Sequence, residues 1–161
     1  MSITFRPAGP DDEPFLLEVY ASARADEMAA VPWSDAQREA FLKMQYTAQS
    51  QHYRSHFPDA DYLIILSDNR PVGRLYVDRS KAEILIIDIT FLQAERNTGS
   101  GTAIIRDLMN EAADAGKPLR IHVESFNPSL RLFERLGFHR VEEEDGDGVY
   151  LLMEWNNGAS S

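Results

Sequence analysis

The chain has 161 residues, no cysteine and a formal net charge of −10, and these facts already exclude several classes of protein. The length is that of one domain. Without cysteine the chain has no disulfide, no thiolate metal site and no thiol nucleophile, and its four scattered histidines lack metal-ligand spacing. The acidic surface makes nucleic acid a poor partner. It would favour a cationic or amine substrate, and the alternative is that the negative charge only keeps the protein soluble.

No part of the sequence predicts an export or membrane segment. Residues 1–7 lack the apolar core of a signal peptide. No apolar stretch approaches the ~20 residues that span a bilayer. We therefore expect a cytoplasmic protein with no membrane partner, and the absence of cysteine suits that reducing compartment.

The first third of the chain predicts a strand followed by two helices. Residues 3–7 have the pattern of a short strand, and a helix with acidic residues at its start is expected over about 10–27. Ser34 and Gln37 then have the spacing of a capping box, which predicts the start of a long helix over about 35–55.

The middle of the chain predicts three strands joined by turns. They cover residues 62–66, 72–78 and 83–92, and the first two form a hairpin. Asp88 interrupts the otherwise apolar run of the third strand. A buried carboxylate needs partners or a shifted pKa, so Asp88 is either a functional carboxylate or part of a solvated strand edge.

The last third predicts a helix, a strand, a second helix and a final hairpin. The helix that follows residue 100 ends at Gly116, because glycine favours the left-handed residue after a helix. Asn127 caps the next helix, with Pro128 at its first position. The remaining predicted elements are a strand over 119–123, the closure of the second helix at Gly137, and a hairpin of 138–144 and 149–155 across the turn 145–148.

A glycine-rich stretch at residues 96–102, between a strand and a helix, has the arrangement of a phosphate-binding loop. It is not a Walker loop, and Ile104 stands where a dinucleotide fingerprint needs glycine. Its R-x-x-G-x-G pattern resembles the pyrophosphate loop of the GNAT (Gcn5-related) N-acetyltransferases. Asn127 and the segment 132–138, Leu-Phe-Glu-Arg-Leu-Gly-Phe, resemble that family's N…LYExLGF motif.

The resemblance implies a fold and a domain boundary. The fold is α+β: a central, mostly antiparallel mixed sheet of about seven strands flanked by four helices, in the order βααβββαβαββ. The resemblance is specific over 72–155 and topological before that. We expect one GNAT domain over residues 1–156 and a frayed tail over 157–161.

The resemblance also implies acetyl-coenzyme A as co-substrate, without a metal. Backbone N–H groups of the loop would hold the pyrophosphate, side chains would add contacts, and the end of the central strand would pair with the pantetheine amides. The implied cofactor-binding residues are Ile89, Thr90, Phe91, Arg96, Asn97, Thr98, Gly99, Ser100, Gly101, Thr102, Asn127 and Phe133.

Acyl transfer to an amine needs a base, because an alkylammonium with a pKa near ~10.4 must lose a proton before it attacks. Strand alternation puts His122 and Glu124 on one polar face. His122 lies five residues before Asn127, where some ribosomal-protein-acetylating relatives carry a catalytic Glu. His122 is therefore the first candidate, Glu124 and Asp88 are the second, and a solvated strand-face histidine is the alternative.

Phe133 departs from the family pattern, because many GNATs carry a Tyr there that protonates the leaving thiolate. Three interpretations follow. The thiolate leaves unprotonated, since alkyl thiols have a pKa near ~8.5; another group such as Tyr76 or a water donates the proton; or catalysis is weak or lost.

In the family the two N-terminal helices form one wall of the acceptor site. By that resemblance Trp33, Phe41, Gln45 and Tyr76 are substrate-pocket candidates, and ordinary core packing is the alternative. We expect the acceptor to be a small-molecule amine or a peptide N-terminus, and the protein to be a monomer or homodimer. The leading hypothesis is an acetyl-CoA-dependent N-acetyltransferase acting by direct attack. The alternatives are a silent acyl-CoA-binding or regulatory module and, more remotely, another nucleotide-binding domain.

Overall fold

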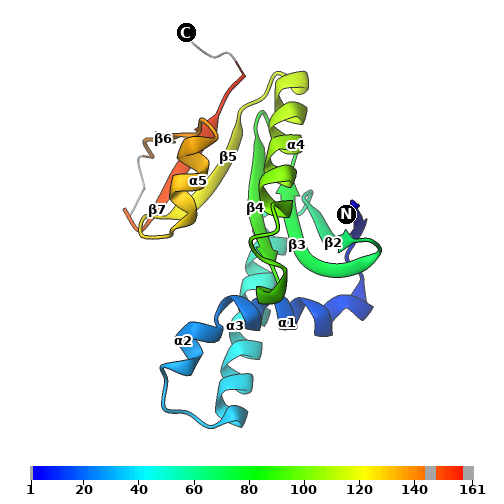
Figure 1. The fold of residues 1–161 in the computed structure, drawn as a ribbon, viewed down its shortest axis with the longest axis vertical. Helices are drawn as coiled ribbons and strands as arrows, with labels where there is room; N and C mark the ends of the chain where they lie inside the picture. The colour runs from blue at the N-terminus through cyan, green and yellow to red at the C-terminus, as the bar shows by residue number, and fades with distance from the viewer. Residues whose placement is uncertain (1, 144–147, 158–161) are drawn as a thin grey trace. The chain divides into compact units, whose positions relative to one another are not determined.

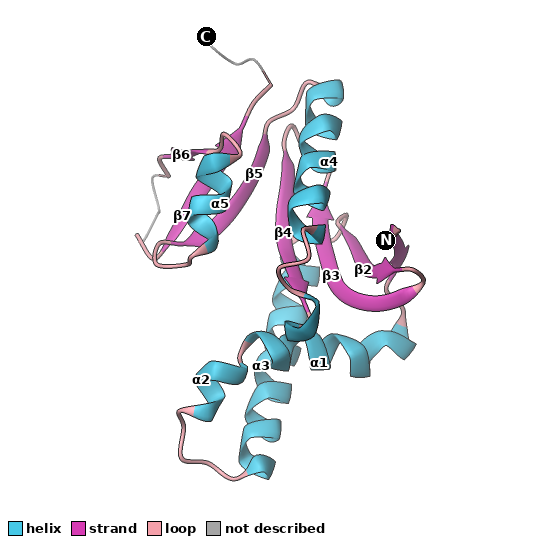
Figure 2. Ribbon diagram, in the orientation of Figure 1, coloured by secondary structure: helices cyan, strands magenta, loops and turns pink. Residues whose placement is uncertain are grey.

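The computed structural model describes residues 2–143 and 148–157. Seven strands form a sheet in the order β1-β2-β3-β4-β5-β7-β6 (Figures 1 and 2). The described residues also contain five α-helices and two short 3-10 helices, Pro10–Asp12 and Gln93–Glu95. The elements are β1 Ile3–Pro7, α1 Glu13–Ala23, α2 Ala25–Ala29, α3 Asp35–His56, β2 Asp61–Ser67, β3 Arg70–Asp78, β4 Ile84–Phe91, α4 Ser100–Ala115, β5 Leu119–Glu124, α5 Ser129–Arg135, β6 His139–Val141 and β7 Tyr150–Trp155.

The pairing of the strands is mostly antiparallel. β1 pairs with β2, β5 with β7 and β6 with β7 in antiparallel ladders, whereas β4 and β5 are parallel. The parallel pair follows from the connection, because a chain that returns to the same end of a sheet needs a crossover, and α4 is that crossover. The predicted mixed α+β sheet is confirmed.

The chain divides into two compact units. The first comprises residues 1–76 and 88–100, and the second comprises 77–87 and 101–161. The chain therefore passes between them within β3, within β4 and at the start of α4. The expectation of one domain over 1–156 stays a prediction. Most of the tail expected to fray, residues 158–161, lies outside the described residues.

The first unit has an aromatic and aliphatic core. Leu16 and Tyr20 of α1 meet Tyr46 of α3 and Ile64 of β2, and all four are buried. The Tyr20 and Tyr46 rings lie edge to face, with 5.9 Å between their centroids. Burial of these side chains fixes α1 and α3 to each other and to the sheet of this unit.

In the second unit, β5 has one apolar and one polar face. Leu119, Ile121 and Val123 are buried, and the residues between them are more exposed. α5 packs on β5, and Phe133 meets Phe138 with 5.2 Å between ring centroids. The alternation predicted for this strand is confirmed, and it leaves His122 on the face away from the buried residues.

Several local predictions can be compared with the structure. The capping box of α3 is confirmed: Gln37 N donates to Ser34 Oγ at 3.2 Å, and Ser34 N donates to Gln37 Oε1 at 2.9 Å. The single helix expected over 10–27 is wrong, since Arg24 leaves helical geometry and separates α1 from α2. The C-terminal hairpin is formed by β6 and β7, but residues 145–147 of its predicted turn lie outside the described residues. Among the described residues, no helix is both long and apolar enough to cross a bilayer.

Candidate active site

The glycine-rich loop leads from the end of β4 into α4 through two left-handed residues. Asn97 has φ 62° and Gly99 has φ 85°, and α4 begins at Ser100. A Cβ at Gly99 would meet no atom within 4 Å, so the space above this backbone is open. No backbone carbonyl in the described part of the chain accepts a hydrogen bond from the N–H groups of residues 97–99. Left-handed turns that expose N–H groups form concave anion sites.

Side chains hold the loop in this shape. Thr98 Oγ1 donates to Ser100 Oγ at 3.0 Å, and Ser100 N donates to Thr98 Oγ1 at 3.4 Å. Arg96 Nε donates to the Phe91 carbonyl at 3.4 Å, and its side chain is exposed. Gly101 and Thr102 lie in the first turn of α4, at the positive end of a helix of 16 residues.

The end of β4 lies tightly against β3. A Cβ at Gly73 would be 2.4 Å from the Thr90 carbonyl oxygen and 3.1 Å from Phe91 Cα, so only glycine allows this approach. Leu92 N donates to the Val72 carbonyl at 2.9 Å directly after the strand. Ile89, Thr90 and Phe91 are half-buried, and their backbone course is fixed by β3.

Asp88 is paired with a buried arginine from β3. Arg74 Nη2 lies 2.7 Å from Asp88 Oδ2, and the two side chains are 3% and 12% exposed. Tyr53 of α3 donates to the same oxygen at 3.5 Å, and Thr90 Oγ1 donates to Oδ1. Arg74 Nη2 also donates to Gln49 Oε1 at 2.9 Å. A solvated strand edge is therefore wrong for Asp88, because β4 is an internal strand and both carboxylate oxygens have partners.

Burial changes the acidity of the groups around this pair. Burial alone would lower the pKa of Arg74, but the Asp88 charge opposes that effect and the pKa ends above its ordinary value. Burial raises the pKa of Tyr53, and the nearby Asp88 charge raises it further. Burial also raises the pKa of Tyr76, whose ring lies 4.9 Å from Arg74 Cζ. Tyr76 is therefore a reluctant proton donor, and its role as an acid stays a prediction.

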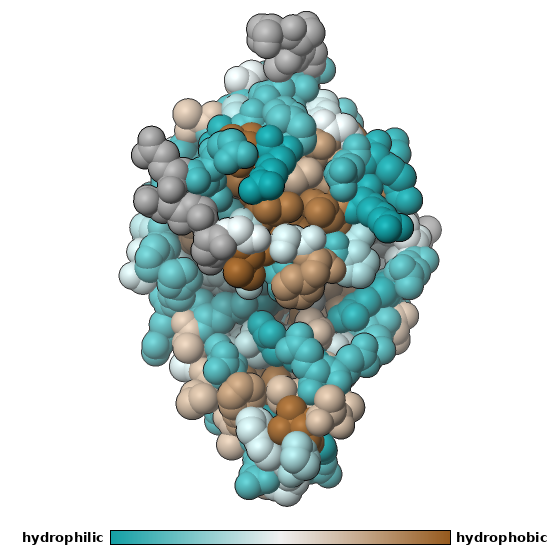
Figure 3. Space-filling view, turned by 90° about the vertical axis from the view of Figure 1, so that its left-hand side faces the viewer, coloured by the Kyte–Doolittle hydropathy of each residue, from teal (hydrophilic) through white to brown (hydrophobic). Residues whose placement is uncertain are grey.

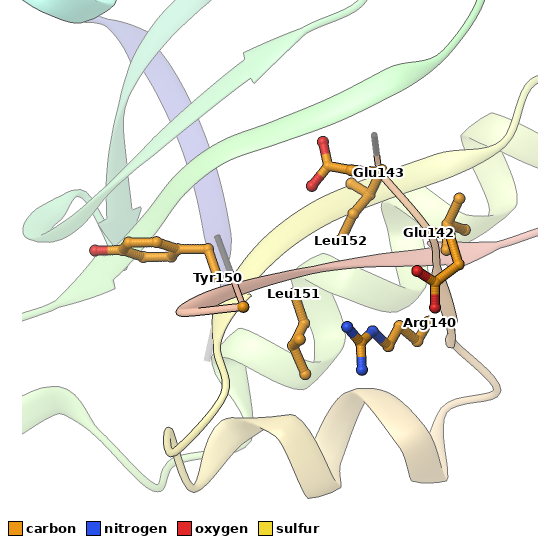
Figure 4. A pocket seen from close by; sticks show the side chains of 8 residues that line it. Arg140, Glu142, Glu143, Tyr150, Leu151 and Leu152 are labelled. Carbon is orange, nitrogen blue, oxygen red and sulfur yellow. The ribbon is translucent and has the colours of Figure 1, made fainter. Parts of the chain in front are cut away.

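The second unit carries His122 and Glu124 on one face of β5. His122 Nε2 lies 3.2 Å from the carboxylate of Glu143, and the two side chains are 44% and 36% exposed. The β5–β7 register places Glu124 opposite Tyr150. Glu143 and Tyr150 line a cavity of about 300 Å³ between the ends of β6 and β7 (Figure 4). Asp88 belongs to the other unit, so the three predicted base candidates divide between the two units.

A family model described as the acetyltransferase (GNAT) family matches residues 22–138, which is most of the chain. The chain belongs to the GNAT acetyltransferase family. Among curated protein sequences, none matches it significantly.

Solved structures share this GNAT fold at low sequence identity. The PaiA N-acetyltransferase of Thermoplasma acidophilum, solved with coenzyme A, has a TM-score of 0.68 at 19% identity, covering 98% of this chain and 100% of that one. An acetyltransferase of Thermus thermophilus has a TM-score of 0.66 at 16% identity, covering 98% of each. The ribosomal-protein-S18-alanine N-acetyltransferase of Escherichia coli has a TM-score of 0.62 at 18% identity, covering 96% of this chain and 94% of that one. At these identities the likeness concerns the fold.

The two positions of the second GNAT motif are well ordered by their neighbours. Ser129 N donates to Asn127 Oδ1 at 2.9 Å, directly before the helix. The prediction that Asn127 is the N-cap and Pro128 the first helical residue is wrong by one position, because α5 begins at Ser129 and Pro128 is its N-cap. Asn127 also lines an open cavity of about 480 Å³. Phe133 is buried against Phe138, so its ring is part of the core of the second unit.

The predicted acceptor-site residues do not share one environment. Trp33 is 37% exposed and meets Phe41 edge to face at 5.2 Å, and Gln45 is exposed on α3. Apolar side chains lie among polar ones over α2 and the start of α3, at the lower end of Figure 3. Tyr76 instead is buried in the sheet of the first unit. Their assignment to substrate binding stays a prediction.

Three residues that the sequence alone did not indicate join the candidates. Arg74 and Tyr53 hold Asp88, and Glu143 holds His122. Arg74 could have been noticed, because a charged residue within the run Val72–Val77 needs a buried partner. Nothing in the sequence links Glu143 to His122. Among the described residues, no three His, Cys, Asp or Glu side chains are placed to hold a metal ion.

Proposed function

We propose that this protein is an N-acetyltransferase that moves the acetyl group of acetyl-CoA to a primary amine by direct attack. The observation that carries the proposal is the open, left-handed loop at the start of α4, in a chain of the GNAT family. The loop fits a pyrophosphate because its exposed N–H groups and the helix dipole both favour an anion. The predicted metal-free character of the site is part of this proposal.

Coenzyme A would be held by three parts of the chain. The backbone of residues 97–102 would take the pyrophosphate, with Arg96 beside it as a cation. The end of β4, Ile89 to Phe91, would pair with the pantetheine amides. Asn127 and Phe133 stay cofactor-binding candidates through their place in the second GNAT motif, and the Phe133 ring itself is buried against Phe138. When bound, acetyl-CoA supplies a thioester that an amine can attack.

A base must first take a proton from the acceptor ammonium. His122 is the better candidate, because it is exposed and has one ring nitrogen directed to a carboxylate. Asp88 is the weaker candidate, since Arg74 neutralises its charge and both of its oxygens are already in hydrogen bonds. Glu124, two residues from His122 on the same face of β5, is the alternative candidate for the base.

The neutral amine then attacks the thioester carbonyl carbon and forms the nitrogen–carbon bond, the carbon–sulfur bond breaks, and the sulfur keeps the electron pair. The nitrogen gives its excess proton to water, which leaves the neutral amide. Phe133 has no proton to give, so the thiolate leaves as such or takes a proton from water; a pKa near ~8.5 for alkyl thiols makes this departure feasible. Holding both substrates in place supplies much of the remaining acceleration.

The experiment that tests this function is acetyl-CoA turnover, read as free thiol release, against a panel of small amines, amino acids and peptide N-termini. Acceptor-dependent release supports the transferase and identifies the acceptor class. Tight coenzyme A binding with no release from any acceptor would contradict it and favour the alternative, a silent acyl-CoA-binding module, for which Phe133 is the specific observation.

Phe133→Tyr separates these two functions further. A large gain in turnover in the variant means that the missing hydroxyl limits catalysis, which supports a weak enzyme or a binding module. An unchanged rate in a protein that already turns over readily rules the silent module out. Thermal unfolding of the variant is the control, because Phe133 is buried and a new hydroxyl there needs a partner.

A further inference from the structure

We propose that Glu143 is a positioning residue that sets the tautomer of His122, so that Nδ1 is the atom that receives the proton of the acceptor amine. This inference rests on the acetyl transfer proposed above and deepens it. It starts from one contact of the second unit, His122 Nε2 to the Glu143 carboxylate at 3.2 Å.

The strand registers explain why these two residues meet. His122 of β5 lies opposite Leu152 of β7, and Leu152 lies opposite Val141 of β6. Residues opposite each other in antiparallel pairs project to the same face. Glu143 lies two residues beyond Val141, the last residue of β6, and its carboxylate meets His122 Nε2 from there. The contact therefore depends on the strand order β5-β7-β6 and not on any nearness in sequence.

The contact assigns the proton on the imidazole. A carboxylate only accepts, so Nε2 must carry the hydrogen that it donates to Glu143, and in the neutral ring Nδ1 then has the lone pair. In the described part of the chain, Nδ1 of His122 has no hydrogen-bond partner. An imidazole arranged in this way accepts a proton at Nδ1 and keeps its orientation while it does so.

The pair has little value as a structural element. Its side chains are 44% and 36% exposed, and such surface pairs stabilise a fold by only ~0–1 kcal/mol. The strand registers place other polar groups on the same face: Arg120 and Glu124 of β5, Glu154 of β7 and His139 of β6. Arg120 Nη2 lies 2.6 Å from Glu154 Oε2, and Glu124 lies opposite Tyr150. Orientation of the ring is thus the main physical consequence of Glu143, and orientation matters where the ring has to take a proton from a defined direction.

The test is a double-mutant cycle on the full chain with the acceptor found by the panel. Glu143→Ala is expected to lower kcat roughly tenfold with little change in the KM for acetyl-CoA, less than the ~10²–10⁴-fold expected for loss of the base in His122→Ala. In the His122→Ala background, Glu143→Ala should have no further effect. Glu142→Ala, the adjacent exposed acid, is the matched control and should leave kcat unchanged.

Ring nitrogen NMR of His122 gives a readout that does not depend on turnover. The wild type should show the tautomer with hydrogen on Nε2, and Glu143→Gln should keep it, because the amide oxygen still accepts; Glu143→Ala should show a mixture. An equal loss from Glu143→Ala with and without His122, or a wild type with hydrogen on Nδ1, overturns the inference while acetyl transfer stands. A wild type that releases no thiol with any acceptor overturns the proposed function itself.

Discussion

Arg74→Met should destabilise the protein strongly, because it leaves the Asp88 carboxylate buried without its cation. The two groups lie 2.7 Å apart at 3% and 12% exposure, and the guanidinium also donates to Gln49. Removal of one member of a buried ion pair costs about 3–5 kcal/mol. Methionine keeps most of the side-chain volume, so this cost comes from the uncompensated charge and not from a cavity.

The same reasoning gives two further values. Asp88→Leu should cost a similar ~3–5 kcal/mol, since it leaves Arg74 unpaired. Arg74 Nε and Nη1 have no hydrogen-bond partner among residues 2–143 and 148–157, so burial of this arginine is already costly in free energy. The double variant removes both charges, and replacement of a whole buried pair by apolar groups is often neutral or stabilising. We expect it to lie within about 1 kcal/mol of the wild type.

The assay is urea unfolding of the four proteins without ligand, followed by far-UV circular dichroism and by tryptophan fluorescence. Trp33 lies in the first compact unit and Trp155 in the second, so the fluorescence reports on both units. The circular dichroism and fluorescence transitions must coincide before a single free energy of unfolding is assigned to each protein. Arg70→Met is the matched control, because Arg70 lies on the same strand and pairs with Glu95, but its side chain is 61% exposed. This substitution should lower the free energy of unfolding by less than ~1 kcal/mol. Equal losses of unfolding free energy in Arg74→Met and Arg70→Met would refute this reasoning. So would a double variant whose loss equals the sum of the Arg74→Met and Asp88→Leu losses.

Three other predictions concern local features. The hydrogen bond from Arg6 lowers the pKa of Asp12 to about 2. The charged carboxylate therefore stabilises the fold above the ordinary pKa of 3.8, and this stabilisation is lost as the pH falls toward 2. At pH 5 the wild type should unfold at a higher urea concentration than Asp12→Asn, and the difference between their urea midpoints should close by pH 2. Gly73→Ala pushes β3 away from the Thr90 carbonyl and should lower the free energy of unfolding by ~1–3 kcal/mol. It should also raise the dissociation constant of coenzyme A measured by calorimetry, and an unchanged constant would count against a role for the end of β4 in binding. Ser34→Ala should lower the free energy of unfolding by ~1 kcal/mol, and no loss would mean that the capping box is not formed in solution.

The sequence by itself determined the features that depend on neighbouring residues. The capping box of α3, the left-handed Gly116 after α4, the alternation of β5 and the loop before α4 all follow from spacing within a few residues. The family motifs added the order of the elements, because a chain of this length with those two segments has few other folds to adopt. The extra helix α2 was missed, since a change of backbone angle at a single ordinary residue, Arg24, leaves no pattern.

Only the tertiary structure decided which partners the charged residues have. Asp88 is a plain break in an apolar run until β3 brings Arg74 beside it, and His122 is a lone histidine until the strand order brings β6 to the far side of β7. These contacts join residues 14 and 21 positions apart in the chain. Period and composition describe one segment at a time, whereas the chemistry of an ionisable side chain depends on which other segment folds against it.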